Sequence, residues 1–250
     1  MDSGLYAAYT GLLARTQALD TAANNLANAG TVGFRAQSDY FRSVLAGTEN
    51  AASPSQVGDA VNNFGVLGGN LIDQGQGALT ATGNPLDLAL NGPGYFAIQS
   101  NEGVQYTRDG AFLRSDTGVL TTAQGEPVLD VGGNPITVPS GAVSVGPDGS
   151  ISVTTDQGSS IAGQVGVYGF PEGTALIAQG TNRFVAPDGV QAAVVSAPVQ
   201  QGSLEGANLD AVHGTMQLIL MQRQGEMMQK ALNVFYNDLD KTATEELGRV

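Results

Sequence analysis

The stretch "TAANNLANAGTVGFRAQSDYF", residues 21 to 41, starts with the Ala and Leu content of a helix and changes character at Gly30. Its helical part contains three asparagines, Asn24, Asn25 and Asn28. Asn28 and Gly30 are typical of a helix end, because both residue types tolerate the left-handed conformation that often follows the last turn. Asn24 and Asn25 lie one turn earlier, where a buried amide without a partner costs about 1–3 kcal/mol. We therefore expect at least one of them to fix the register of the helix against a partner.

The leucines upstream of this stretch repeat every seven residues, at Leu5, Leu12, Leu19 and Leu26. This spacing is typical of a coiled-coil seam, and it predicts a helix over about residues 3–28.

The C-terminal segment contains no proline from residue 200 to residue 250, and it predicts a second helix over about residues 208–244. Its apolar side chains form two stripes. The first comprises Val212, Met216, Leu220, Met227, Ala231 and Val234, and the second comprises Met221, Met228, Leu232, Phe235 and Leu239. Together the stripes are wide enough for several neighbours, which leaves open whether they pack within one chain or between chains.

The middle of the chain has a different composition. All ten prolines lie between Pro54 and Pro198, and 27 of the 35 glycines lie between residues 46 and 203. Leucines alternate in "PLDLAL", and pairs typical of hairpin turns occur at residues 109–110, 117–118, 148–149 and 188–189. These patterns predict an antiparallel β domain.

The predicted fold class is therefore α+β, with the N- and C-terminal helices paired as a coiled-coil-like core and an antiparallel all-β domain inserted between them. We expect four regions. They are an N-terminal helix with its following turn (residues 1–45), an extended and partly flexible connection (46–83), the β domain (84–200) and the C-terminal helix (201–250).

Charge and composition exclude several classes of partner. Acidic residues outnumber basic ones 23 to 10, which argues against nucleic acid and anionic membrane surfaces. No apolar run approaches the ~20 residues that span a bilayer, so we expect no membrane insertion. Cysteine is absent, and the N-terminus lacks the pattern of a cleavable secretion signal. We expect a chain that either stays in the cytoplasm or leaves it without losing a signal peptide.

The search for catalytic chemistry finds no motif. His213 is the single histidine, and the only lysines, Lys230 and Lys241, do not follow a glycine-rich loop. Arg108 and Asp109 are expected at a hairpin tip, with the arginine in solvent. We predict no catalytic, cofactor or metal site. Two rival functions stay open at this point: a β domain that binds a glycan or matrix partner, and a glycosidase with two approaching carboxylates.

Four blocks of sequence resemble one protein family. "ANNLANAGTVGFRAQSDYF" is similar to the N-terminal signature of the bacterial flagellar rod and hook proteins. The blocks "NPLDLALNGPGYFAIQ", "YTRDGAFLRSDTGVLTTAQGEPVL" and "SLEGANLDAV…MQRQGEMMQKALNVF" follow in the family's order and cover nearly the whole chain. The length and the single β domain are most similar to the proximal rod subunits, with distal rod and hook-type subunits as alternatives.

The resemblance implies a structural subunit of the flagellar basal body with no enzymatic activity. It implies export through the flagellar type III apparatus, without a cleaved signal peptide. It also implies polymerisation through the terminal helices, with copies of itself and with other rod proteins, into the periplasmic drive shaft that transmits torque for motility.

The residues expected at the assembly interface come from both helices and from the signature turn. They are Leu5, Leu12, Leu19, Asn24, Asn25, Leu26, Asn28, Gly33, Phe34, Met216, Leu220, Met227, Met228, Leu232 and Phe235. In such an assembly, Asn24 and Asn25 are expected to set the register between subunits.

Overall fold

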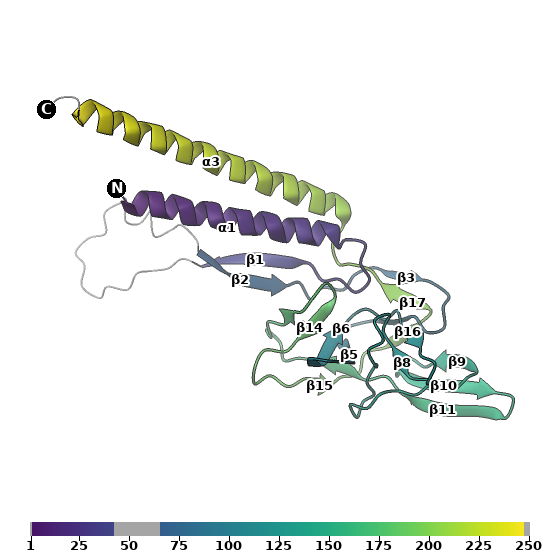
Figure 1. The fold of residues 1–250 in the computed structure, drawn as a ribbon. Helices are drawn as coiled ribbons and strands as arrows, with labels where there is room; N and C mark the ends of the chain where they lie inside the picture. Colours follow the sequence, from purple (N-terminus) through teal and green to yellow (C-terminus); the bar gives the residue numbers. More distant parts are fainter. Residues whose placement is uncertain (1, 43–65, 248–250) are drawn as a thin grey trace. The chain divides into compact units, whose positions relative to one another are not determined.

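The computed structural model describes residues 2–42 and 66–247, with side chains described over residues 9–40, 69–230 and 233–234. Helix α1 spans Asp2–Ala27 and helix α3 spans Ala211–Leu247, and strands β1 to β17 lie between them in sequence (Figure 1). The chain forms two compact units. The helical unit comprises residues 1–26, 37–71 and 211–250, and the β unit comprises residues 27–36 and 72–210.

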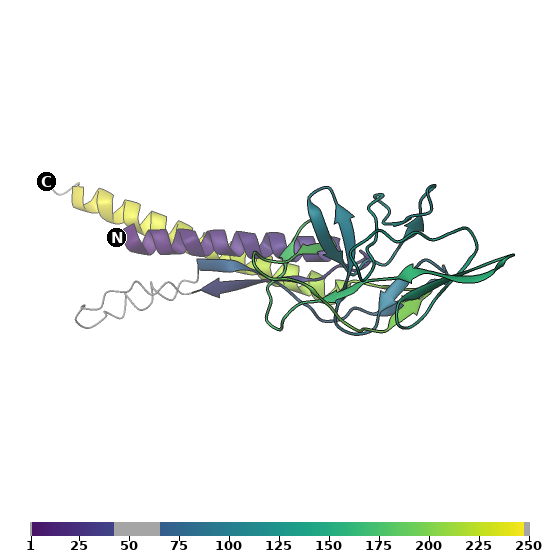
Figure 2. The ribbon, with the colours of Figure 1, turned by 90° about the horizontal axis from the view of Figure 1, so that it is seen from below.

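The two helices are continuous in both ribbon views (Figures 1 and 2). Helix α1 ends at Ala27, where the N–H of Thr31 turns back and donates to the carbonyl of Asn28 at 2.9 Å. The 37 residues of α3 contain no proline, which keeps every backbone N–H available to the helix. In the helical unit, a two-stranded sheet pairs β1 (Gln37–Arg42) with β2 (Val66–Ile72).

The prediction of a coiled-coil-like core is wrong. Among the described side-chain positions of α1, the buried ones are Gly11, Ala14, Ala18, Ala22 and Asn25. Leu12, Leu19 and Leu26 are only half-buried. On α3, Met216, Leu220 and Met227 are 55–62% exposed. The leucines have the spacing of a seam, but a line of alanines is the packed face, because their small side chains let the helix backbone approach its neighbour closely.

The largest sheet of the β unit has six strands in the order β13-β14-β6-β5-β12-β15. Their bounds are Ile177–Ala178 (β13), Arg183–Val185 (β14), Gly103–Thr107 (β6), Tyr95–Ser100 (β5), Val167–Gly169 (β12) and Ala193–Val194 (β15). A second sheet has the order β11-β10-β9, with β9 at Ala142–Val145, β10 at Ser150–Thr155 and β11 at Gly158–Gln164.

Three two-stranded pairs complete the β unit. They join β16 (Val199–Gln201) to β4 (Leu88–Leu90), β17 (Ser203–Glu205) to β3 (Leu79–Ala81), and β7 (Leu113–Arg114) to β8 (Leu120–Thr121). The strand pairs of the β unit are antiparallel. Its main core includes Leu88, Leu90, Phe96, Ile98 and Phe112, all at most 1% exposed.

The predicted turn pairs have different outcomes. Asp148-Gly149 lies in the β9–β10 hairpin, with Gly149 at a φ of 80°, and Thr117-Gly118 lies between the paired strands β7 and β8. The hairpin prediction is confirmed at these two places. Asp109-Gly110 is not a hairpin tip, because β6 and β7 belong to different sheets. Instead, Gly110 packs so closely that a Cβ there would lie 1.7 Å from the carbonyl oxygen of Leu88.

Candidate assembly surfaces and the signature turn

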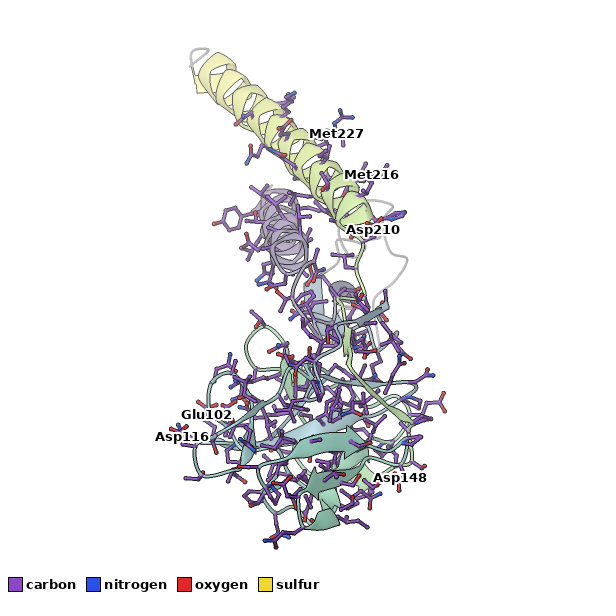
Figure 3. All side chains as sticks on the ribbon, turned by 90° about the vertical axis from the view of Figure 1, so that its right-hand side faces the viewer. Glu102, Asp116, Asp148, Asp210, Met216 and Met227 are labelled. Atoms are coloured by element: carbon purple, nitrogen blue, oxygen red, sulfur yellow. The ribbon has the colours of Figure 1, made fainter. Side chains whose placement is uncertain are left out.

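Helix α3 carries an exposed apolar surface. It comprises Val212, Met216, Ile219, Leu220, Met227 and Val234, each 45–66% exposed. The spacing of three, four and seven residues places these side chains along one side of the helix. Figure 3 labels Met216 and Met227 on this helix. Exposed apolar side chains grouped along one side of a helix are typical of interaction sites in soluble proteins, because burying one Leu or Met side chain contributes about 1.5–3 kcal/mol.

The other predicted interface residues of the helices are covered to different extents. Met228 is half-buried, as are Leu12, Leu19 and Leu26. Two further apolar side chains of α1, Tyr9 and Leu13, are 63% and 54% exposed. The side chains of Leu5, Leu232 and Phe235 lie outside the described residues.

Asn25 is paired within its own chain. Its Nδ2 donates to the carbonyl of Gln37 at 2.7 Å, and its Oδ1 accepts from the N–H of Gln37 at 2.9 Å. The amide thus satisfies both backbone groups of the first residue of β1 and fixes the register of α1 against that strand. Asn24 is exposed, and the Oδ1 of Asn28 accepts from the hydroxyl of Thr31 at 3.2 Å.

A shallow hollow of about 210 Å³ lies beside Asn25 in the helical unit. Ala18 and Ala22 of α1, Asp39 of β1, and Gln217 and Met221 of α3 contribute to its lining. Desolvation by burial raises the pKa of the Asp39 carboxyl, and a hydrogen bond from Thr21 partly opposes this shift.

The signature turn, residues 28–34 directly after α1, belongs to the β unit. Gly33 has a φ of 68°, and its N–H donates to the carbonyl of Glu205 at 2.8 Å. A Cβ at Gly33 would lie 2.3 Å from the backbone nitrogen of Asp109, so this position requires glycine on two separate grounds. Phe34 is fully buried.

A buried ion cluster stands next to the turn. Arg35 Nη2 lies 2.8 Å from Glu205 Oε1, and Arg108 Nη1 donates to Glu205 Oε2 at 2.8 Å. All three side chains are at most 3% exposed. The remaining partners of Arg108 are the carbonyl of Gly92 at 2.6 Å and the face of the Tyr95 ring, 5.3 Å from its centroid. Breaking such a pair from one side leaves a buried charge without compensation.

This cluster corrects the prediction of a solvent-exposed Arg108. Desolvation by burial lowers the pKa of Arg108, while the charge of Glu205 acts in the opposite direction. Burial also raises the pKa of the Tyr95 hydroxyl, against the influence of Arg35 and Arg108. Arg108 and Glu205 are 97 residues apart in the chain, so no local pattern in the sequence indicates their pairing.

No group of three or more His, Cys, Asp or Glu side chains able to hold a metal ion occurs in the described part of the chain. Neither helix, over the residues the structure describes, combines the length and apolar character needed to cross a bilayer.

Comparison with known proteins finds two segments of the chain that match families of flagellar proteins. Residues 5–35 match the family "Flagella basal body rod protein", and residues 89–153 match the "Flagellar hook protein FlgE/F/G D1 domain". The chain is 34% identical to the flagellar basal-body rod protein FlgF of Caulobacter vibrioides, with 100% of both chains covered.

Further relatives are also flagellar basal-body rod proteins. Identity is 36% with the rod protein FlgF of Rhizobium meliloti, over 99% of both chains. It is 32% with the rod protein FlgG of Caulobacter vibrioides, over 96% of this chain and 97% of that protein. These matches extend over both helices and the β unit, and they confirm the family predicted from the sequence blocks. The chain belongs to the family of bacterial flagellar basal-body rod proteins and is a structural subunit of that rod.

Proposed function

We propose that this rod subunit assembles through the exposed apolar surface of α3, together with the exposed side chains of α1, against copies of itself and other rod proteins. The single observation that carries the proposal is the exposure of Met216, Leu220 and Met227 along one side of α3. Covering these three side chains contributes about 1.5–3 kcal/mol each, enough to matter against the cost of association.

The role of the assembly is mechanical. A rod that spans the periplasm transmits torque, and the subunit needs no catalytic group for this task. The names of the relatives support this view, because they describe rod proteins. On the resemblance of length and sequence blocks, we place the subunit in the proximal part of the rod. Basal bodies from a deletion strain test this position: rods that stop at their base are expected, whereas rods that lack only their outer part would contradict it.

Export through the flagellar type III apparatus, without cleavage, is part of the proposal. The chain recovered from purified basal bodies is then expected to have the mass of the full sequence. A shorter mass with a trimmed N-terminus would contradict this route.

The substitution Met227→Glu tests the assembly surface. Met227 is 62% exposed, so the purified variant is expected to keep the helical content and stability of the parent chain. A carboxylate in a buried subunit contact is costly, so basal bodies with complete rods and swimming motility are expected to be lost. Electron microscopy of basal bodies and motility in soft agar measure the two outcomes.

Gln229→Glu is the matched control. It introduces the same charge two residues along the same helix, at an exposed polar position, and is expected to leave rods intact. Normal rods in the Met227→Glu strain would show that this surface does not carry assembly.

A further inference from the structure

The chain passes between its two units four times. The boundaries lie at residues 26/27, 36/37, 71/72 and 210/211. Each boundary leaves a segment end in the β unit. Contacts within the unit must hold these ends if the unit is to keep its structure when force acts on the attached elements. The described contacts show where three of these ends are joined.

The side chain of Asn208 joins three of these segment ends, those at residues 36, 72 and 210. Its Oδ1 accepts from the N–H of Ala36 at 2.7 Å. Its Nδ2 donates to the carbonyls of Asp73 at 3.0 Å and Gly75 at 3.1 Å. Its own N–H donates to the carbonyl of Phe34 at 3.3 Å. The side-chain amide therefore uses both its oxygen and its NH2 group. Glutamine is the only other residue type that carries these groups, and its side chain is longer.

Backbone contacts close the same group. The N–H of Asp73 donates to the carbonyl of Ala36 at 2.8 Å, so the segments before residue 37 and after residue 71 are also bonded directly to each other. Two residues before Ala36, the backbone of Phe34 accepts from Asn208. We call these five residues, Phe34, Ala36, Asp73, Gly75 and Asn208, the Asn208 junction.

The fourth end, at residue 27, belongs to the same segment as Ala36, and the turn in this segment is held next to the junction. The turn after α1 is attached to β17 through the bond from Gly33 N–H to the carbonyl of Glu205. Asn182 links the same turn to Asp109, which follows β6. Its Nδ2 donates to the carbonyl of Val32 at 3.2 Å and to Asp109 Oδ2 at 2.9 Å. Glu205 lies three residues before Asn208, so the ion cluster and the junction share one segment.

We propose that Asn208 is the positioning residue that makes the four segment ends open and close as one unit. Removing the donors of its amide then weakens contacts that Asn208 does not itself make, because each segment is held only while the others are in place. This coupling is a property of the free chain. It stands or falls independently of the proposed assembly surface, because it is measured on purified protein with no rod present.

The sharpest variant is Asn208→Asp. It keeps the size of the side chain and the acceptor for Ala36, but it replaces the Nδ2 donor with an oxygen that faces the carbonyls of Asp73 and Gly75. Hydrogen exchange of the full chain, resolved by amide, is the measurement. The amides of Gly33 and Asp73, which bond to Glu205 and Ala36, are expected to exchange about tenfold faster or more, together with Ala36.

Two references define the result. The amide of Leu120, which donates to Ile136 elsewhere in the β unit, is expected to change by less than about twofold. Asn101→Asp makes the same chemical change at an exposed turn and is expected to leave all four amides unchanged.

Faster exchange at Ala36 alone, with Gly33 and Asp73 unchanged, would overturn the proposal, since Asn208 would then be a local contact only. An equal rise at Leu120 would overturn it as well, because the junction would then not be a unit of its own. If Asn208→Asp does not fold, Asn208→Ser, which is shorter and uncharged, is measured at the same amides with the same criteria.

Discussion

Single atoms decide the form of the signature turn. The missing Cβ of Gly33 leaves room for the backbone of Asp109, and the turn then delivers Phe34 and Arg35 into the β unit. Arg35 meets its counter-charge, Glu205, with the side chains of both residues fully buried. The charge of Arg35 is thus tolerated only because the turn places it next to one particular carboxylate.

Gly33→Ala is expected to lower the free energy of unfolding by at least about 2 kcal/mol, because both the positive φ and the 2.3 Å approach to Asp109 oppose a side chain. Urea unfolding of the full chain measures this change. Gly30→Ala serves as the control, since a Cβ at Gly30 meets nothing within 4 Å. Equal stabilities for the two variants would contradict the steric account of Gly33.

Asp109 gives a pH prediction. Desolvation by burial raises the pKa of its carboxyl above the ordinary value of 3.8, against hydrogen bonds from Ala111 and Asn182. The group therefore adds stability that is fully present below pH 3.8 and is lost as the pH rises through its pKa in the folded state. The free energy of unfolding of the parent chain minus that of Asp109→Asn is expected to fall across this range. A difference that rises with pH would refute the shift.

At the scale of elements, helix α1 has one packed face and one exposed face. Alanines and Asn25 form its packed face, while Tyr9 and Leu13 remain exposed. The two hydrogen bonds of Asn25 to Gln37 attach the helix to β1 at a single register. A buried amide in a helix is thus explained here by a strand of the same chain.

Asn25→Leu is expected to lower the stability of the helical unit by about 2–4 kcal/mol, because it leaves both backbone groups of Gln37 without their partner. Urea unfolding followed by the helical circular dichroism signal measures the loss. Asn24→Leu, at the exposed neighbouring position, is the matched comparison and is expected to have a smaller effect. A larger loss for Asn24→Leu would show that the packed face has been assigned to the wrong asparagine.

Local sequence patterns predict where the helices begin and end, but they do not predict how the helices pack. Both observed helices end within three residues of the predicted limits, because proline, glycine and apolar period act over short distances. The heptad leucines suggested a seam, but a repeat identifies a face and not its partner. The pairing of Arg108 with Glu205 and of Ala36 with Asn208 joins residues 97 and 172 positions apart, beyond the reach of any periodic signal.

At the scale of the whole molecule, a net charge of −13 acts against association. Exposed turns carry part of this charge, for example at Glu102, Asp116 and Asp148, which Figure 3 labels. The exposed apolar surface of α3 acts in the opposite direction. The balance between charge repulsion and apolar burial is therefore sensitive to salt.

Raising the salt concentration from 0.1 M to 1 M shortens the screening length from about 10 Å to about 3 Å. Self-association of the purified chain is therefore expected to increase, as measured by sedimentation velocity. Met227→Glu is expected to show less association at both concentrations, because the apolar contact is interrupted. Association that decreases with salt would indicate that ion pairs, and not apolar burial, hold the subunits together.

The hydrogen bond between Ala36 and Asn208 also limits when the β unit can be completed. Its two partners are 172 residues apart, so the segment around Ala36 waits for its partner until synthesis has passed residue 208. A chain that stops between residues 205 and 208 contains every strand of the β unit and still lacks the amide that joins Ala36 to Asp73 and Gly75. This contact of the β unit thus forms only in a chain whose synthesis has passed residue 208.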